Sequence, residues 1–335
     1  MKVLLYFEAQ KQIAQSGIGR AMKHQINALV SNGIQYTLNP KDDFDILHIN
    51  TVGFKSEKII KKARKKNVPV IYHAHSTEED FKNSFIFSNA FAPLFKRRII
   101  KLYSSADLII TPTEYSKKLI ENYGIKKEII NISNGIDLGR FKPSKTKVEK
   151  FRNFFNIKEN EKVIFGVGLY FERKGILDFI SVAQKNPDLK FIWFGHTNKL
   201  LVQSKIKKAI KNAPENVIFP GYIKGDIIEG AFLGADLFFF PSNEETEGIV
   251  VLEALAAKQK VLIRDIGVYD GWLTSGLNCY KGSNVDEFSE LITDILSGNK
   301  KSTQDEGYEV AKNLTVDKVG KKLVENYIRI IDTHE

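Results

Sequence analysis

Short apolar runs alternate with longer amphipathic stretches along the whole chain. Each run is bounded by Gly, Pro, Asn or an acidic residue, which is typical of a strand buried on both faces of a sheet. The stretches between them favour helices, because their apolar residues recur at helical spacing. The pattern predicts strands at 3–7, 43–50, from 70 onward, 129–133, 162–169, 190–195, 216–223, 235–240 and 260–264. It predicts helices at 21–31, 58–67, 176–185, 248–257 and 323–331.

Strands that alternate with helices predict an α/β fold with doubly wound parallel sheets. A chain of 335 residues is too long for one ordinary core and fits two Rossmann-like domains. An Asn134-Gly135 turn and Pro143 interrupt the pattern between the two halves. We therefore expect one domain at 1–145 and a second at 146–315, with a last helix at 316–335.

Charge is spread unevenly over a chain whose formal net charge is +10. Residues 1–145 hold 24 Lys and Arg against 13 Asp and Glu, or +11, while the remainder holds 26 against 27, or −1. This asymmetry predicts a polyanionic partner for the first half, such as an anionic membrane, although a Lys-rich surface that only aids solubility has the same composition. No apolar run approaches the 18 or more residues of a membrane span, the first strand is too short for a signal peptide, and the single Cys279 excludes an internal disulfide.

The most informative stretch is the acidic loop after the strand at 235–240. Glu245 lies in this loop, Gly248 begins the next helix, and Glu253 interrupts an otherwise apolar helix. Loops at the carboxyl ends of parallel strands bind ligands, and a helix N-terminus favours phosphate. A carboxylate at Glu253 needs a hydrogen-bond partner such as a sugar hydroxyl, unless the helix turns that one polar position toward solvent.

This string, Pro-Ser-x-x-Glu-x-x-Gly-Ile-Val-x-Leu-Glu-Ala, resembles the E-x7-E signature of family 4 retaining glycosyltransferases, which have the GT-B fold of two Rossmann-like domains facing a cleft. The resemblance implies that Glu245 lies near the donor sugar and Glu253 binds the ribose. It implies that the backbone at Gly248, Ile249 and Val250 holds the diphosphate. Thr246 and Glu247 stand where the family usually has Gly and an aromatic residue.

Further donor contacts follow from the same resemblance. Lys174 matches a family lysine that binds the diphosphate, whereas Leu169 stands in place of a family arginine that Arg173 can replace. Cations beside Gly175 at a helix start suit a diphosphate, although a salt-bridged surface turn has the same pattern. Gly17 and Ile223 match positions near the donor phosphates and the base.

Two histidines follow the strand that begins at Val70. His75 matches the family histidine beside the reacting centre, and His73 is the weaker candidate. We expect the side chains of His73 and His75 to point to opposite faces of the strand, and we therefore expect no metal site here.

Phenylalanines and basic residues are concentrated between Phe81 and Tyr103. Aromatic residues beside Lys and Arg suit an anionic bilayer, although a buried core helix also carries a Phe stripe. We expect acceptor or membrane contacts from Phe85, Phe91, Lys96, Arg97, Arg98 and Lys101.

The His-Ser-Thr-x-x-Asp-Phe string at 75–81 and this basic aromatic stretch are similar to the family 4 enzymes of bacteria that add a second hexose to monoglucosyl-diacylglycerol. The resemblance implies transfer of glucose from UDP-glucose to this glycolipid, with galactose left open as the donor sugar. It implies no metal or other cofactor, and a last helix that crosses back to the first domain. We expect a peripheral enzyme on the cytoplasmic face of the membrane.

Two other functions remain open. A family 4 enzyme with a soluble or cell-wall polymer acceptor keeps the same donor residues. A non-enzymatic binder of polyanions explains the basic half, but no nucleic-acid recognition motif is visible.

Overall fold

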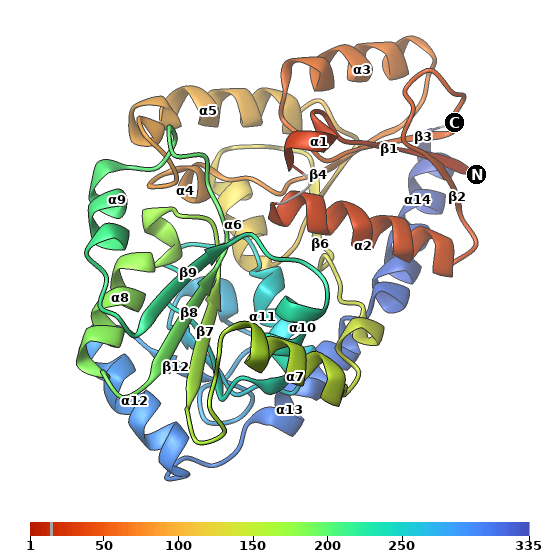
Figure 1. Ribbon diagram of the computed structural model, residues 1–335. Coiled ribbons are helices and arrows are strands. Elements are labelled where there is room, and N and C mark those ends of the chain that lie inside the picture. Colours follow the sequence, from red (N-terminus) through yellow and green to blue (C-terminus); the bar gives the residue numbers. More distant parts are fainter. Residues whose placement is uncertain (14–15, 335) are drawn as a thin grey trace. The chain divides into compact units, whose positions relative to one another are not determined.

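The computed structural model describes residues 1–13 and 16–334, with the side chains of Lys11 and Gln12 left out. The chain forms two compact units. The first unit comprises Met1–Phe81, Asn89–Ile136 and Leu314–Glu335, and the second comprises Lys82–Ser88 and Asp137–Asn313. Each unit is described separately below (Figure 1).

The first unit is built on a six-stranded sheet in the order β2-β1-β3-β4-β5-β6. Every neighbouring pair in it is parallel. Its strands are β1 (Lys2–Tyr6), β2 (Gln35–Thr37), β3 (Ile46–Ile49), β4 (Val70–His73), β5 (Leu108–Thr111) and β6 (Glu128–Asn131). Strands β3, β4 and β5 are buried at every residue, as their uninterrupted apolar runs predict.

Helices cover both faces of this sheet. They are α1 (Gln10–Ile13), α2 (Gly17–Ser31), α3 (Phe54–Lys65), α4 (Glu78–Phe81), α5 (Ser88–Tyr103), α6 (Glu114–Asn122) and α14 (Val316–His334). Val3, Leu5 and Ile71 pack against α2 and α14, whereas Leu4 and Tyr72 pack against α3, α5 and α6. Successive strand residues point to opposite faces, so each strand supplies both cores.

The second unit repeats this architecture with the strand order β12-β11-β10-β7-β8-β9, again with all neighbours parallel. Its strands are β7 (Val163–Val167), β8 (Lys190–Phe194), β9 (Val217–Gly221), β10 (Leu237–Phe240), β11 (Val261–Arg264) and β12 (Tyr280–Gly282). Its helices are η1 (Leu138–Phe141), α7 (Lys145–Phe154), η2 (Glu172–Lys174), α8 (Ile176–Lys185), α9 (Ser204–Lys211), α10 (Asp226–Gly234), α11 (Ile249–Ala256), η3 (Gly267–Tyr269), α12 (Val285–Ser297) and α13 (Gln304–Asn313).

The two sheets confirm the α/β class and the doubly wound topology expected from the sequence. The chain passes from the first unit to the second at Ile136 and returns at Leu314; the sequence placed these boundaries at 145/146 and 315/316. The sequence pattern missed the edge strands β2 and β12, which have three residues each. A run of three residues is too short to show a period.

The last helix, α14, belongs to the first unit and packs against α2. Val319, Leu323, Tyr327 and Ile330 recur at helical spacing and bury one face of α14 in the core. Gly320 lies at the contact, where a Cβ would come within 2.4 Å of the Ala28 carbonyl oxygen and 2.2 Å of Asn32 Nδ2. The absence of a side chain at this position permits the close approach of the two helices.

We therefore expect Gly320→Ala to destabilise the protein by about 1–3 kcal/mol, because overpacking outweighs the gain in helix propensity of up to about 1 kcal/mol. Urea unfolding measures this change. Gly17→Ala is the matched control, because a Cβ there meets nothing within 4 Å. A Gly320→Ala protein as stable as the wild type would contradict the proposed contact.

Candidate active site

The second unit has a topological switch point between two adjacent strands, β7 and β10. The chain proceeds from β7 outward to β8 and β9, then crosses back to β10 on the other side of β7. The loops that follow these two strands diverge, which leaves room for a ligand beyond their carboxyl ends. We call residues 168–175 the β7 loop and residues 241–248 the β10 loop. The β7 loop carries Arg173 and Lys174, and the β10 loop carries Glu245.

Glu245 is buried at the centre of an ion-pair cluster that joins these two loops. Its Oε1 accepts hydrogen bonds from Lys174 Nζ and, at 2.7 Å, from Ser242 Oγ. Arg173 Nη1 lies 3.9 Å from the same oxygen and donates to the Glu244 carbonyl at 3.0 Å. Burial raises the pKa of Glu245, but the positive charges of Lys174 and Arg173 and these hydrogen bonds outweigh it, so the pKa lies below its usual value. Glu245 is therefore a carboxylate at neutral pH.

Arg173 also binds the short segment 82–88, which belongs to the second unit. Its Nε donates to Ser84 Oγ at 2.7 Å, and its backbone N–H donates to the Asn83 carbonyl at 3.1 Å. The Arg173 carbonyl in turn accepts from Asn243 N at 2.6 Å. The guanidinium thus has protein partners on two sides, and a role for Arg173 in phosphate binding stays a prediction.

The backbone of the two loops is in direct contact beside this cluster. A Cβ on Gly175 would lie 2.0 Å from the Pro241 carbonyl oxygen, and Gly175 has a φ of +74°. Gly248 has a φ of +85° and precedes α11, whose N-terminus has no side-chain cap. Val251 N donates to the Gly248 carbonyl at 2.8 Å, whereas the amides of Gly248, Ile249 and Val250 have no backbone partner among the described residues and remain available to an anion.

Glu253 lies on α11 and is fully buried, so the alternative in which it meets solvent is wrong. Its Oε1 pairs with Arg140 Nη1 at 2.9 Å. Arg140 comes from η1 and also contacts Glu229 on α10, at 3.3 Å. The sequence analysis missed Arg140, since nothing in its local sequence marks a residue that pairs with a carboxylate more than a hundred positions away.

Three buried histidines lie in the first unit at the carboxyl ends of β3 and β4. The rings of His48 and His73 are stacked with centroids 5.5 Å apart, and those of His73 and His75 are stacked at 4.2 Å. His75 Nε2 lies 2.8 Å from Asn50 Oδ1, and Gln25 Nε2 contacts both Asn50 Oδ1 and His73 Nδ1. At the other end of the stack, His48 Nδ1 is 2.5 Å from the hydroxyl of Tyr327 on α14.

The expectation that His73 and His75 point to opposite faces is wrong. The alternation of a strand places residues i and i+2 on the same face, and the stacked rings show that His73 and His75 lie on one side although β4 ends at His73. Burial lowers the pKa of His48 and of His75 to about 3, and it lowers that of His73 well below its usual value. The three rings are therefore neutral at pH 7. Among the described residues, no group of three or more His, Cys, Asp or Glu is arranged to hold a metal ion.

Two other predicted donor residues are Gly17 and Ile223. Gly17 begins α2 in the first unit, where a Cβ would meet no atom within 4 Å. Ile223 follows β9 in the second unit and is half-buried. Neither position has a structural contact that by itself explains the residue type.

The predicted membrane residues have different surroundings. Lys101 and Arg98 pair with Glu57, and Lys96 pairs with Glu78. Phe91 and Arg97 are exposed, while Phe85 is half-buried. Leu94 lies in the predicted stretch between Phe81 and Tyr103 and is strongly exposed, whereas the strongly exposed Phe54 was missed.

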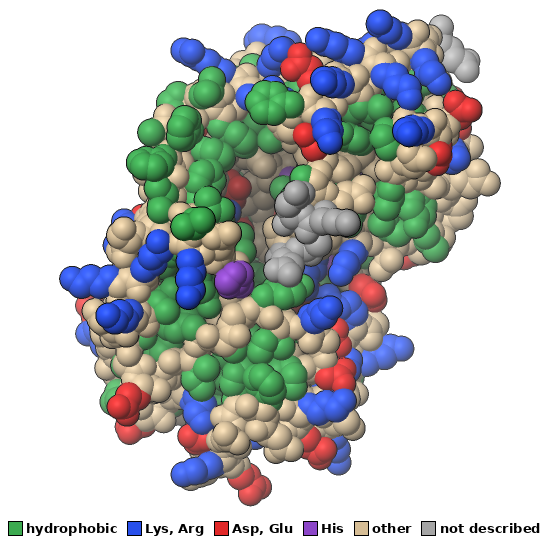
Figure 2. Space-filling model, turned by 45° about the horizontal axis from the view of Figure 1, so that its top comes forward, with side chains coloured by type: hydrophobic (Ala, Val, Ile, Leu, Met, Phe, Trp, Pro, Cys, Tyr) green, Lys and Arg blue, Asp and Glu red, His purple; other side chains and the backbone are tan. Residues whose placement is uncertain are grey.

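We call Phe54, Phe91, Leu94 and the exposed lysines of α3 the α3–α5 surface. Phe54, Phe91 and Leu94 are 78%, 54% and 64% exposed. Arg98 ties the two helices together, because it lies over the Phe54 ring and donates to the Val52 and Gly53 carbonyls. Figure 2 shows Lys and Arg side chains gathered over α3 and hydrophobic side chains over the first half of α5. In the described part of the chain, no helix is both long enough and apolar enough to span a bilayer.

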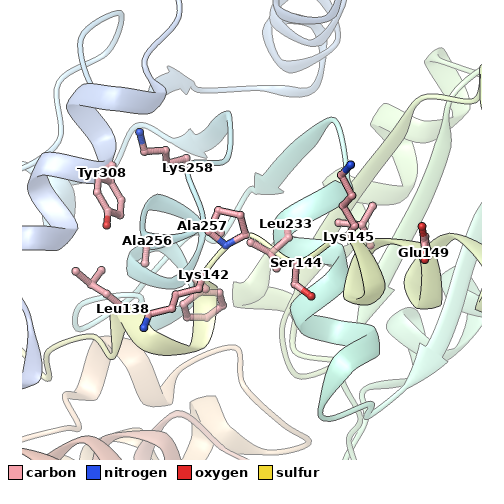
Figure 3. Close-up of a pocket in the computed structure, with 13 residues that line it drawn as sticks. Leu138, Lys142, Ser144, Lys145, Glu149, Leu233, Ala256, Ala257, Lys258 and Tyr308 are labelled. Carbon is pink, nitrogen blue, oxygen red and sulfur yellow. The ribbon is translucent and has the colours of Figure 1, made fainter.

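A cavity of about 520 Å³ lies in the second unit near the carboxyl end of α11 (Figure 3). It is lined by η1, α7, α10 and α13, with Phe141, Leu233 and Tyr308 among its walls and Lys142, Lys145 and Lys258 among its polar groups. None of the residues predicted from the sequence to bind the donor lines it. The candidate active site is at the opposite, amino end of α11.

Family models match both halves of the chain. Residues 147–309 match the family described as glycosyl transferases group 1, and residues 31–140 match glycosyltransferase family 4. The chain belongs to the family 4 glycosyltransferases and is a hexosyltransferase with the GT-B fold.

Within this family, the chain is similar to enzymes of glycolipid synthesis. It is 49% identical over 332 residues to the processive diacylglycerol alpha-glucosyltransferase of Acholeplasma laidlawii, covering 99% of both proteins. It is 23% identical over 272 residues to the alpha-galactosylglucosyldiacylglycerol synthase of Streptococcus pneumoniae, covering 78% of this chain and 72% of that protein.

Solved structures share the fold over nearly the whole chain. The HepE protein of Anabaena, in complex with UDP and glucose, superposes with a TM-score of 0.80 at 17% identity, covering 98% of this chain and 100% of that one. The sucrose-phosphate synthase of Thermosynechococcus elongatus superposes with a TM-score of 0.83 at 15% identity, covering 99% and 100%. At these identities the likeness concerns the fold.

The neutral histidines make stability depend on pH. Below about pH 6.5 the unfolded chain binds protons that the folded first unit cannot bind, so the free energy of unfolding falls as pH falls toward about 3. Each histidine contributes up to about 1.4 kcal/mol per pH unit. We expect His48→Leu to reduce this slope by about 0.7 kcal/mol per pH unit on average in urea titrations between pH 7.5 and 5.5, because the unfolded histidine is only partly protonated in this range.

His196→Leu is the matched control, because the His196 side chain is exposed. Equal slopes for the wild type and His48→Leu would show that His48 is protonated in the folded protein.

Proposed function

We propose that this chain is a retaining glucosyltransferase that transfers glucose from UDP-glucose to monoglucosyl-diacylglycerol. The observation that carries the proposal is the 49% identity, over 99% of both chains, to an enzyme named as a processive diacylglycerol alpha-glucosyltransferase. A structural neighbour whose complex contains UDP-glucose supports the choice of donor.

The second unit binds the nucleotide sugar in this proposal. The diphosphate is held by the ammonium group of Lys174 and by the free amides of Gly248, Ile249 and Val250. A helix N-terminus and a nearby cation both stabilise a bound anion. Arg173 adds positive charge and orders the β10 loop through the Glu244 carbonyl. Glu253 binds the ribose and is oriented by its ion pair with Arg140. Ile223 lies along the base.

Glu245 and His75 position the donor hexose. Glu245 is ionised and accepts from sugar hydroxyls with the carboxylate oxygen that Lys174 and Ser242 leave open. His75 donates through Nε2 to Asn50 Oδ1, which leaves Nδ1 as an acceptor. Gln25, His73 and His48 hold this ring in its neutral form and fixed orientation. Gly17 has no Cβ, which leaves its backbone open to a ligand.

The reaction breaks the bond between the glucosyl C1 and the terminal phosphate oxygen of UDP. A hydroxyl of the acceptor forms the new C1–O bond on the same face, and its proton passes to the departing phosphate. Negative charge grows on that phosphate in the transition state, so electrostatic stabilisation by Lys174 and the α11 amides supplies most of the rate gain.

The acceptor's acyl chains stay in the membrane, so the enzyme must act at its surface. The α3–α5 surface is suited to this, because Phe54, Phe91 and Leu94 expose apolar side chains beside a helix with lysines along its solvent face. We place the enzyme peripherally on the cytoplasmic face, with contact to anionic lipid.

The first test measures UDP release from UDP-glucose, with and without monoglucosyl-diacylglycerol in vesicles, together with mass analysis of the lipid product. We expect lipid-dependent turnover and a dihexosyl product. Lys174→Gln should reduce kcat by roughly 10²–10³-fold, since it removes one group that stabilises the leaving diphosphate.

Lys205→Gln is the matched control for that variant, because Lys205 pairs with Glu172 outside the Glu245 cluster. Transfer to a soluble or polymeric acceptor with no response to the lipid would overturn the glycolipid assignment and leave the donor site intact. No turnover with any nucleotide sugar would overturn the function as a whole.

The membrane contact is tested separately by vesicle sedimentation. The double variant Phe91→Ser, Leu94→Ser should bind vesicles rich in anionic lipid at least about tenfold more weakly, given the free energy of burying two large apolar side chains. Ile328→Ser is the control, because Ile328 is an exposed apolar residue on α14. Equal loss of binding in both proteins would argue against the α3–α5 surface.

A further inference from the structure

Tyr269 has a buried hydroxyl that the family resemblance does not use. The residue lies in η3, and its side chain is completely buried. Within the described part of the chain, its hydroxyl has no hydrogen-bond partner. Buried tyrosine hydroxyls usually have one, as Tyr280 does in donating to the Lys301 carbonyl at 2.7 Å. An unpaired hydroxyl at this position therefore needs an explanation.

The hydroxyl points at the amino end of α11. A Cβ on Gly248 would lie 3.2 Å from the Tyr269 hydroxyl oxygen and 3.4 Å from Val251 Cγ2. Strand β11, which leads into η3, is the neighbour of β10 in the sheet, so the loops after both strands end side by side. The uncapped helix terminus and the unpaired hydroxyl are thus two independent features at one place.

The backbone and ring of Tyr269 are held in place. Its N–H donates to the Ile266 carbonyl at 3.1 Å, and its carbonyl accepts from Leu273 N at 3.0 Å. Its ring packs against Trp272 with centroids 5.7 Å apart. A donor fixed in this way before a ligand arrives loses little conformational entropy on binding.

We propose that Tyr269 is a donor-binding residue whose hydroxyl donates a hydrogen bond to the sugar-proximal phosphate of a nucleoside diphosphate at the α11 N-terminus. The proposal rests on the proposed function, which places a diphosphate there. The sugar-proximal phosphate is the one adjacent to the hexose. We place Glu245 beside the hexose, and among the charged groups Glu245 contributes most to the raised pKa of Tyr269.

The same surroundings keep the hydroxyl a donor. Burial, followed by the charge of Glu245, raises the pKa of Tyr269 well above its usual value, so the phenol keeps its proton at neutral pH. A phosphate oxygen is an acceptor only, and hydrogen bonds to charged acceptors are stronger than those between neutral groups.

Calorimetric titration of the full chain with UDP and with UMP tests the proposal. Tyr269→Phe removes only the hydroxyl. We expect it to bind UDP about 10–100-fold more weakly and to bind UMP, which lacks the second phosphate, as the wild type does. Because the hydroxyl has no partner among the described residues, the Tm without ligand should not fall.

Tyr280→Phe is the matched control, since it removes a buried hydroxyl that does have a partner. It should lower the Tm and leave UDP binding unchanged. Unchanged UDP binding in Tyr269→Phe, or an equal loss for UDP and UMP, would overturn the inference. Failure of the wild type to bind UDP would instead overturn the proposed function.

Discussion

The buried ion pairs among Arg173, Lys174 and Glu245 determine how the second unit presents its candidate site. Three charged side chains with little contact with water are stable only as a set, because the desolvation of each one is offset by the others. The set joins the β7 loop to the β10 loop, and the Gly175–Pro241 contact brings the two backbones together at the same place. The position of the uncapped α11 N-terminus thus depends on Lys174, which lies 71 positions before Glu245 in the sequence. Changing one partner alone leaves a buried charge without compensation.

The first unit uses a different physical principle to position polar groups. His48, His73 and His75 carry no charge at neutral pH, and their orientation comes from ring stacking and from the amides of Gln25 and Asn50. Tyr327 closes the stack from α14, so the last helix contributes both to the hydrophobic core and to this polar row. A neutral network of this kind gives a site directional hydrogen bonding without a fixed charge, which suits contact with sugar hydroxyls.

The sequence predicted the site residues that lie close together along the chain and missed those that meet only in the folded structure. Glu245, Gly248 and Glu253 fall within one strand–loop–helix segment, so their spacing alone placed them at one end of α11. Arg140 and Tyr269 come from other elements, and no pattern in a single sequence reports that such residues meet. The error over His73 and His75 is of another kind, because it misapplied the alternation of a strand, in which residues i and i+2 lie on the same face. The α3–α5 surface was found in part, since an apolar residue in sequence does not reveal whether it is exposed.

The division of the chain between the units has a consequence for its synthesis. The second unit is complete once residue 313 has been made, whereas the first unit still lacks α14 and therefore Tyr327, Leu323 and the Gly320 contact. Domains generally fold in the order in which the ribosome delivers them. Here the first unit begins the chain but is completed last, because its final helix α14 is synthesised after the whole of the second unit. Until then the face of its sheet that α14 covers remains exposed, and a nascent chain stalled before residue 314 presents that apolar face to chaperones and proteases.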